Sequence, residues 1–270
     1  IFHPILVLPM YVIKRSGERE PFDPEKTRLA IMRSGLSLDE ADVVLERLQG
    51  QLYDGISTEE IYRRVRTLLA SNTKVRYGLK KAIMNLGPEG HYFETFVGAL
   101  FKDMGFKIKV REIAQGRCVQ HELDVLADNG KLRYMVECKF HNSLGIKCSI
   151  QTALYTYGRF LDLQTELGLE APWLVTNTRF SSEVVRYGEC VCMGLLGWRF
   201  PEDEGLETLV ERFRLYPVTI LDLRRGDMRT LLENDIILVR DILQRQESVC
   251  SLLSKQSADQ LVAQAELLMG

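Results

Sequence analysis

The sequence predicts an α/β (α+β) fold in three parts, because three different patterns follow one another along its 270 residues. Residues 11–88 carry a hairpin pattern followed by amphipathic helices, which indicates a mostly helical part with one β-hairpin. Residues 89–200 alternate between helical and strand patterns in the order αβββαβαβ, which indicates a mixed sheet with helices on its faces. Residues 201–270 return to short helical patterns and predict a small helical part. Residues 1–10 are treated as a possible non-native or upstream extension, because Met10 directly precedes the first interpretable motif and is a candidate start.

The N-terminal part is predicted to begin with a hairpin and to continue with helices. The apolar run Tyr11 to Ile13 is followed by Ser16-Gly17, a pair typical of a turn between strands. Asp23 can cap the next helix, and Pro24 fits its first turn, where the N–H that proline lacks would have no partner inside the helix. Two further amphipathic helices, each opened by a serine with acidic residues in the first turn, are expected over Ser37 to Gln51 and Ser57 to Leu69.

The central part is predicted to open on a helix, continue with three strands and close with alternating helices and strands. The first helix ends at Gly105 and has an apolar stripe made of Phe93, Phe96, Val97, Leu100, Phe101 and Met104. Strands follow over residues 106–110, 119–126 and 132–140, and the Asp-Asn-Gly segment at 128–130 is a strong hairpin signal between the last two. A helix, a buried strand, a second helix and a short strand are then expected over residues 149–167, 173–177, 182–190 and 193–196.

The C-terminal part is expected to be helical and to serve packing or self-association. Its pattern lacks strand alternation apart from Val218 to Leu221. It carries 13 acidic against 8 basic side chains, a balance that argues against a grip on DNA. Helices are expected over residues 227–233, 235–244 and 258–269.

The composition excludes several classes of protein. A formal net charge of −2 excludes a general polyanion binder, so any contact with nucleic acid must use a local basic patch. The six cysteines include no CxxC pair, so neither a zinc site nor a disulfide framework is supported. The apolar start lacks a charged leader and is too short for a membrane span. We therefore expect a cytoplasmic protein without a membrane partner.

Four residues of the central part form a candidate metal site. Strand alternation puts Glu137 and Lys139 on one face of their strand. Asp124 lies in the hairpin partner and Glu94 on the preceding helix. Carboxylates are ligands that Mg²⁺ prefers, and a nearby ammonium can orient a nucleophilic water or stabilise developing charge. A Glu-x-Lys pair alone is equally consistent with a solvated face of alternating charges, but the order of all four residues favours metal-dependent phosphodiester hydrolysis.

Residues 89 to about 198 resemble the PD-(D/E)XK nuclease superfamily and, within it, the Mrr-like restriction endonucleases. The resemblance is carried by four segments: Phe93-Glu94, His121-Glu122-Leu123-Asp124, Val136-Glu137-Cys138-Lys139, and the Gln-x-x-x-Tyr element formed by Gln151 and Tyr155. One departure is Leu123, which occupies the place of the motif's proline. The resemblance implies a metal site made of Glu94, Asp124 and Glu137, and a catalytic set made of Asp124, Glu137, Lys139 and Gln151.

The segment from Val12 to Lys26 combines a Lys-Arg pair, a turn and a helix start, an arrangement suited to phosphates because free N–H groups and cations act together there. A plain helical domain with a solvated Lys-Arg pair is the alternative. Residues 11 to about 85 are similar to the ATP-cone, the small regulatory domain of ribonucleotide reductases and their repressor, which binds ATP or dATP without hydrolysing it. The resemblance implies nucleotide contacts from Val12, Lys14, Arg15, Glu20, Lys26 and Thr58.

Together the two resemblances predict a DNA endonuclease of the restriction or defence type, similar to type IV restriction enzymes. Mg²⁺ or Mn²⁺ is the expected cofactor and ATP or dATP the expected allosteric ligand, acting on a homo-oligomer. A DNA path is indicated by Lys107, Lys109, Arg111 and Arg117, although exposed lysines on an edge strand also protect against aggregation. The alternative function is a non-catalytic, nucleotide-sensing DNA-binding regulator on a nuclease scaffold. A purely structural assembly protein would require both motif sets to be accidental.

Overall fold

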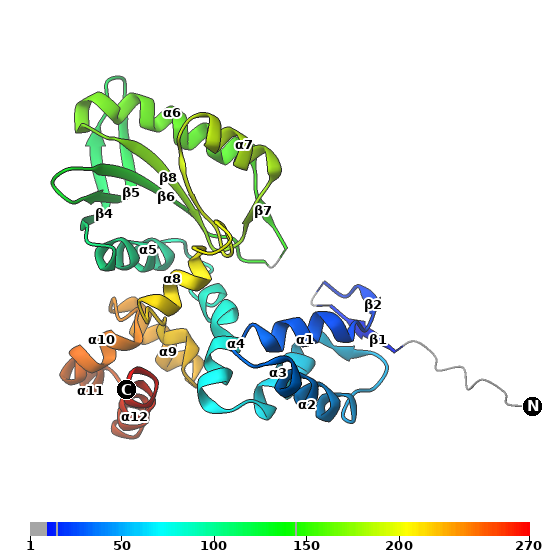
Figure 1. Cartoon of the computed structure of the whole chain (residues 1–270). Coiled ribbons are helices and arrows are strands. Elements are labelled where there is room, and N and C mark those ends of the chain that lie inside the picture. The colour runs from blue at the N-terminus through cyan, green and yellow to red at the C-terminus, as the bar shows by residue number, and fades with distance from the viewer. Residues whose placement is uncertain (1–9, 15, 144) are drawn as a thin grey trace, which may run out of the picture. The chain divides into compact units, whose positions relative to one another are not determined.

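The structure is a computed structural model that describes residues 10–14, 16–143 and 145–270 (Figure 1). Contacts between Cα atoms divide it into two compact units, one ending at Leu79 and the other running from Lys80 to Gly270. The expected mixed α/β fold is confirmed, with a hairpin and helices first, a mixed sheet in the middle and helices at the end. Residues 1–9, treated above as an extension, and Arg15 lie outside the described residues.

The first unit contains a small sheet made of β1 (Tyr11–Ile13), β2 (Arg19–Pro21) and β3 (Ile56–Ser57). β1 lies in the middle, antiparallel to β2 and parallel to β3. Gly17 in the turn has φ +85°, a left-handed conformation that glycine adopts without strain. The predicted hairpin is therefore present, and β3 is an addition to it that pairs from more than forty residues further along the chain.

Four helices follow or flank this sheet: α1 (Pro24–Met32), α2 (Leu38–Gln49), α3 (Thr58–Leu68) and α4 (Ser71–Met84). Polar side chains begin them as predicted. The Asp23 carboxylate accepts two main-chain N–H bonds at the start of α1, and Ser37 and Glu40 form a capping box at the start of α2. The helices bury apolar residues in a core that includes Ile31, Ala41, Leu48, Ile56 and Val65. α4 was not predicted, and it crosses the division between the two compact units.

The second unit is built on a five-stranded mixed sheet in the order β10-β8-β6-β5-β4. Its strands are β4 (Lys107–Gln115), β5 (Gln120–Asp128), β6 (Arg133–Lys139), β8 (Ala171–Thr176) and β10 (Gly194–Leu196). β4, β5 and β6 are antiparallel neighbours, whereas β8 is parallel to both β6 and β10. β4 is longer than predicted because it pairs with β5 as far as Gln115, opposite Gln120.

Helices cover both faces of this sheet. α5 (His91–Asp103) lies on one side, and α6 (Ile150–Leu167) and α7 (Ser182–Cys190) lie on the other (Figure 1). α5 approaches the sheet closely at Gly98, where a Cβ atom would lie 3.1 Å from Val110 Cγ2. On the α6 side, apolar residues of strand and helix share one core that includes Leu123, Met135, Phe160 and Leu163. The close packing fixes α5 and α6 against the same strands and thereby positions the side chains that both helices carry.

The C-terminal segment is helical, with α8 (Leu206–Arg212), a 3₁₀ helix η1 (Val218–Ile220), α9 (Arg225–Glu233), α10 (Val239–Gln244), α11 (Gln246–Leu252) and α12 (Lys255–Met269). The alternation noted over Val218 to Leu221 does not form a strand, since η1 occupies that position. The helix expected from Asp235 begins only at Val239, because Asp235 has φ +54° and the Asp241 carboxylate accepts hydrogen bonds from the two N–H groups before the helix. Among the described residues, no helix is both long and apolar enough to cross a lipid bilayer.

Two short elements complete the second unit, a parallel pair of two-residue strands, β7 (Lys147–Cys148) and β9 (Arg179–Phe180). Neither was predicted, because two residues carry no periodicity that a pattern can reveal. β7 immediately precedes α6, and the Cys148 main-chain oxygen accepts a hydrogen bond from the Ser181 N–H at 3.0 Å. The pair therefore ties the start of α6 to the start of α7.

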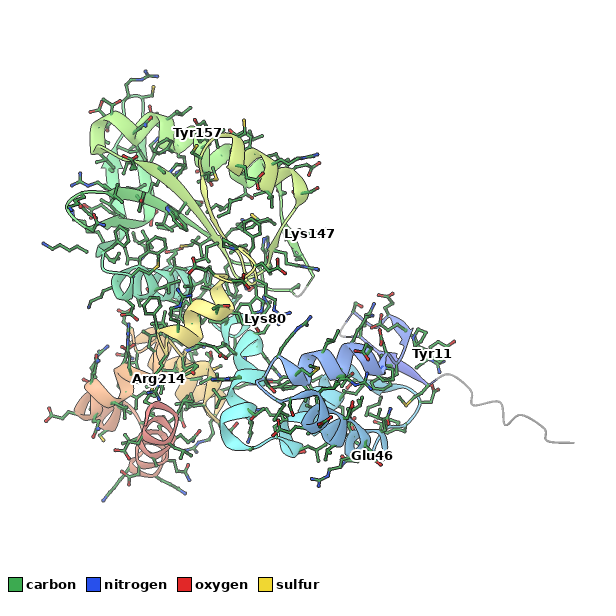
Figure 2. All side chains as sticks on the ribbon, viewed as in Figure 1. Tyr11, Glu46, Lys80, Lys147, Tyr157 and Arg214 are labelled. Carbon is green, nitrogen blue, oxygen red and sulfur yellow. The ribbon has the colours of Figure 1, made fainter. Side chains whose placement is uncertain are left out.

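The last turns of α4 are held inside the second unit. Lys80, labelled in Figure 2, donates a hydrogen bond to the Asn177 main-chain oxygen. The Asn177 amide donates to Met84 Sδ at 3.1 Å, and the Ala82 main-chain oxygen accepts a hydrogen bond from Thr219 Oγ1 at 2.6 Å. Burial lowers the pKa of Lys80 to about 7. The end of α4 is thus bonded both to the loop after β8 and to the C-terminal helices.

Candidate active site

Strands β5 and β6 separate at the position of the predicted acids. Their pairing ends at Val125, opposite Val136, while β6 continues alongside β8 to its last residue, Lys139. Asp124 and Glu137 are the next residues beyond the last β5–β6 pair. The opening therefore displays both carboxylates from strands that are otherwise locked into the sheet.

Asp124 lies at a second interruption, on the β4 side. The β4–β5 ladder omits the pair formed by Arg111 and Asp124, and Arg111 there has φ +54°, a region that residues with a side chain rarely occupy. Asp124 Oδ2 instead accepts a hydrogen bond from the Cys138 N–H at 2.7 Å. Beyond the last β5–β6 pair, the Cys138 N–H of β6 is therefore bonded to the Asp124 side chain of β5 and not to a main-chain oxygen of that strand.

Glu137 is paired with an arginine from α6. Its Oε2 accepts a hydrogen bond from Arg159 Nη1, and Arg159 Nη2 donates to the main-chain oxygen of Glu122. The two side chains are 15% and 9% exposed, so this ion pair is shielded from water. Removing one partner of such a buried pair strongly destabilises the folded protein, because the other charge is left uncompensated.

Glu94 enters the site from the first turn of α5. Its side chain is 18% exposed, and its Oε2 lies 3.9 Å from Arg111 Nη1. The same Arg111 nitrogen donates to Thr95 Oγ1 at 3.3 Å. Arg111 was predicted to follow a DNA path along β4, and the structure places its guanidinium beside the predicted metal ligand of α5.

The three carboxyl groups influence one another electrostatically. Burial, followed by the charge of Asp124, raises the pKa of Glu94 to about 7. Burial and the charge of Asp124 also raise the pKa of Glu137 to about 7, against the opposing effect of Arg159. Burial raises the pKa of Asp124, while its hydrogen bond from Cys138 acts in the opposite direction. Burial is the largest cause of all three pKa shifts, and the charge of Asp124 adds to it for the two glutamates. A bound cation would favour the ionised forms of these carboxyl groups.

We expect the free energy of unfolding, measured without metal, to fall as pH rises from 4.5 through 7. Glu94 and Glu137 have a folded pKa of about 7 against an ordinary value of 4.5, so the folded protein retains protons that the unfolded chain has released. The stabilising contribution of such a raised pKa is complete below the ordinary value and is lost as pH rises through the folded value. Urea unfolding in EDTA, between about pH 5 and pH 8, measures this dependence.

The control for this prediction is the double variant Glu94→Gln with Glu137→Gln, which removes both titrating groups. Its unfolding free energy should depend less on pH than that of the wild type over the same interval. Equal pH dependence of the two proteins would contradict the prediction.

Lys139 and Gln151 lie at the same end of the sheet as the acids. The Lys139 side chain is exposed, and among the described residues it forms no hydrogen bond or ion pair. The main chain just after it is fixed by Asn177, whose Oδ1 accepts from the His141 N–H at 2.8 Å and whose Nδ2 donates to the His141 oxygen at 2.9 Å. Gln151 is exposed in the first turn of α6. The strand end that carries the lysine is therefore fixed while its ammonium stays accessible.

Arg159 was missed by the sequence reasoning. It follows Gln151 and Tyr155 on α6 at intervals of four residues, which puts the three on one stripe of the helix. Its Cζ atom lies 5.4 Å from the centroid of the Tyr155 ring. This spacing is the one signal in the sequence that could have found it.

The donor chemistry of the site fits a divalent cation of the Mg²⁺ type, since Glu94, Asp124 and Glu137 all offer carboxylate oxygens. Within the described residues, however, no three His, Cys, Asp or Glu side chains are grouped so that they could hold a metal ion. Glu137 is turned to Arg159, and Asp124 to the Cys138 N–H. The structure brings the predicted ligands into electrostatic range of one another without arranging them around one point.

Of the predicted nucleotide contacts, three lie together on the hairpin of the first unit. Val12 pairs with Glu20 across β1 and β2 and is 4% exposed. Lys14 forms ion pairs with Glu20 at 2.7 Å and with Glu18 at 3.1 Å. The hydrogen bond to Glu20 raises the pKa of Lys14. Arg15 belongs to this group in sequence but is outside the described residues.

The other two predicted contacts lie at helix starts. Lys26 is exposed in the first turn of α1, with its Nζ 3.8 Å from Asp23 Oδ2. Thr58 is the first residue of α3, and Ser57 before it pairs with Ile13 of β1. Side chains already accept N–H groups at both helix starts: Asp23 accepts those of Glu25 and Lys26 at α1, and Ser57 accepts that of Glu60 at α3. An anion bound there would therefore compete with these caps for the N–H groups.

Comparisons with known proteins divide the chain in three. Residues 10–84 match the family model of the ATP cone domain, residues 87–190 that of a restriction endonuclease, and residues 216–269 that of the C-terminal part of AF1548-like proteins. An uncharacterized protein of Archaeoglobus fulgidus is 39% identical over 173 residues, which span 63% of this chain and 98% of that protein. A crystal structure of a protein of unknown function, AF1548, is similar with a TM-score of 0.60 and 37% identity, over 67% of this chain and 100% of that one.

Proposed function

The chain belongs to the AF1548-like family, with an ATP-cone followed by a restriction endonuclease domain, and from that premise we propose that it is a metal-dependent DNA endonuclease regulated by ATP or dATP. We assign nucleotide binding to residues 11–88, cleavage to residues 89–200 and packing or self-association to residues 201–270. The observation that carries the proposal is the opening between β5 and β6, which displays Asp124 and Glu137 one residue beyond the last strand pair. A restriction or defence role, of the type IV kind, is the finer proposal.

In the proposed reaction, Glu94, Asp124 and Glu137 would hold Mg²⁺ or Mn²⁺. When bound, such an ion stabilises charge on a phosphate and lowers the pKa of water towards neutrality. Lys139 donates from an exposed ammonium to the attacking water or to a phosphate oxygen, an electrostatic role that suits an accessible cation. Asn177 holds the main chain behind Lys139. Gln151, with a donor and an acceptor on one amide, orients the lysine or the phosphate.

The DNA would approach along β4, where Lys107 and Lys109 are exposed. Lys109 forms an ion pair with Glu112 at 2.7 Å, so part of its charge is compensated before DNA arrives. Phosphate contacts of this kind position the duplex without selecting its sequence.

The experiment that tests the function is cleavage of supercoiled plasmid by the full chain in Mg²⁺ or Mn²⁺. Unmodified and methylated DNA are compared, each with and without ATP or dATP. Metal-dependent nicking that EDTA abolishes supports the proposal. DNA binding that responds to nucleotide, without cleavage of any substrate, would instead support the alternative of a non-catalytic regulator.

Nucleotide binding is predicted to depend on Lys14. Replacement of Lys14 by alanine should weaken ATP and dATP binding about tenfold or more, since a hydrogen bond to a charged group contributes about 1.5–3 kcal/mol. In the free protein Lys14 is held by Glu18 and Glu20, and a phosphate would compete for it. Isothermal titration of the full chain measures the affinity. Lys131→Ala, which removes an exposed lysine from the hairpin between β5 and β6, is the matched control, and equal affinity of both variants would refute the assignment.

Regulation through assembly is the proposed link between the two activities. A nucleotide shifts an equilibrium only if it binds two states unequally, so ATP and dATP should change the distribution of oligomers. Sedimentation velocity of the full chain, with and without each nucleotide, tests this. Identical profiles in all three conditions would count against control by oligomerisation and leave the cleavage proposal untouched.

A further inference from the structure

Arg159 is an unusual residue for the interior of a protein. It is 8% exposed, and of its donor groups Nη1 reaches Glu137 and Nη2 reaches the main-chain oxygen of Glu122. Its Nε is buried and has no hydrogen-bond partner within the described part of the chain. A buried N–H group without an acceptor is unfavourable, so an arginine here is not the arrangement that stability alone would favour.

The charge of Arg159 is permanent, because guanidinium groups remain protonated in proteins. Glu137 therefore has a cation against one of its oxygens at every pH at which the protein is folded. That cation occupies the carboxylate which the proposed metal ion would need. With Glu137 held in this way, the described residues contain no group of three ligands arranged for a metal.

The other contacts of Arg159 do not depend on Glu137. The bond from Nη2 to Glu122 and the position of Cζ 5.4 Å from the Tyr155 ring centroid would both persist if the carboxylate turned away. A guanidinium stacked near an aromatic ring keeps part of its stabilisation there. Release of Glu137 thus leaves the arginine with contacts on α6 and β5.

We propose that Arg159 is a positioning residue that serves as the resident counter-ion of Glu137, holding this carboxylate in the metal-free protein and competing with the divalent ion for it. The inference rests on the proposed metal-dependent function and specifies how its site is controlled. It predicts that the wild-type chain binds metal more weakly than its carboxylates would alone. A purely structural cross-link between α6 and the sheet would have no such effect on metal affinity.

The test measures Mn²⁺ binding to the full chain without DNA, by titration calorimetry and by the electron paramagnetic resonance signal of free Mn²⁺. Arg159→Met removes the charge but keeps an apolar stem of similar length. It should bind Mn²⁺ about tenfold or more tightly than the wild type, because an arginine beside a carboxylate lowers its proton affinity by about 1–3 orders of magnitude and should weaken its binding of a metal cation in the same direction. Arg159→Gln keeps a hydrogen-bond donor and should show the same direction. It guards against the possibility that the methionine variant does not fold.

The matched control is Arg133→Met, which removes an arginine that pairs with Asp128 at 2.6 Å at the opposite end of β6 and should leave Mn²⁺ affinity unchanged. Unchanged or weaker Mn²⁺ binding in both Arg159 variants would overturn the inference. Glu137→Gln distinguishes failure of the proposed metal site from failure of the counter-ion role alone. If it does not weaken Mn²⁺ binding, the metal site and the proposed function fail, whereas if it does and the Arg159 variants bind no tighter, only the counter-ion role fails.

Discussion

Replacing Glu137 by glutamine is expected to lower DNA cleavage by about a thousandfold or more, while DNA affinity changes by less than about threefold. The substitution keeps the shape of the side chain and an oxygen to which Arg159 Nη1 can still donate. It removes the negative charge from a carboxylate that is 15% exposed, beyond the last β5–β6 pair. Nicking of supercoiled plasmid and fluorescence anisotropy with a labelled duplex measure the two quantities on the same preparations.

Lys139→Met is the companion variant, and it should lose cleavage to a similar extent because the exposed ammonium is removed while the strand is kept. Glu166→Gln, on an exposed position of the last turn of α6, is the control and should cleave like the wild type. Cleavage that persists in both Glu137→Gln and Lys139→Met would place the activity at another site of the chain.

Phe101→Ala is expected to lower the free energy of unfolding of the second unit by about 3–5 kcal/mol, the usual cost of removing a large side chain from a packed core. Phe101 is fully buried in α5, with its ring centroid 5.6 Å from that of Trp173 in β8 and 6.0 Å from that of Phe106. The cavity would lie between α5 and the sheet. Because α5 also carries Glu94, we expect weaker Mn²⁺ binding as a secondary effect.

Tryptophan fluorescence during urea unfolding measures this effect in the second unit alone, because both tryptophans of the chain, Trp173 and Trp198, belong to it. The control is Met104→Ala at the end of α5, where the side chain is 37% exposed and the expected change is within about 0.5 kcal/mol. A loss below about 1 kcal/mol in Phe101→Ala would show that the core relaxes around the missing ring.

Elements with a strong local period could be predicted from the sequence. The helix expected over residues 182–190 has the same bounds in α7, and the helix over 149–167 differs from α6 by one residue. The second half of β4 was not predicted, because its extent is set by pairing with β5 and not by its own pattern. α4 was missed for a related reason: Lys80 is a charged residue that packs inside the protein, against Asn177, almost a hundred residues away.

The candidate site likewise contains residues that a local pattern predicts and contacts that no local pattern predicts. Asp124, Glu137 and Lys139 could be proposed because they belong to one hairpin, in which antiparallel pairing across a short turn brings residues of the two strands together. The contact of Arg159 with Glu137 joins residues 22 apart through the packing of a helix on a sheet, and no local pattern specifies it. Arg111 and Asp124 do not pair in the β4–β5 ladder, and the alternating pattern of these strands gives no sign of this interruption.

The continuity of α4 determines how the chain can be divided for experiments. A fragment that starts at residue 89 would lose the bonds that Lys80, Ala82 and Met84 make with Asn177 and Thr219. It would leave Thr219 Oγ1 without its acceptor and the Asn177 loop without one of its supports. Failure of such a fragment to fold or to cleave DNA could therefore result from the missing end of α4 alone. A truncation that retains residues 71–270 preserves these bonds and tests cleavage in the absence of the hairpin of the first unit.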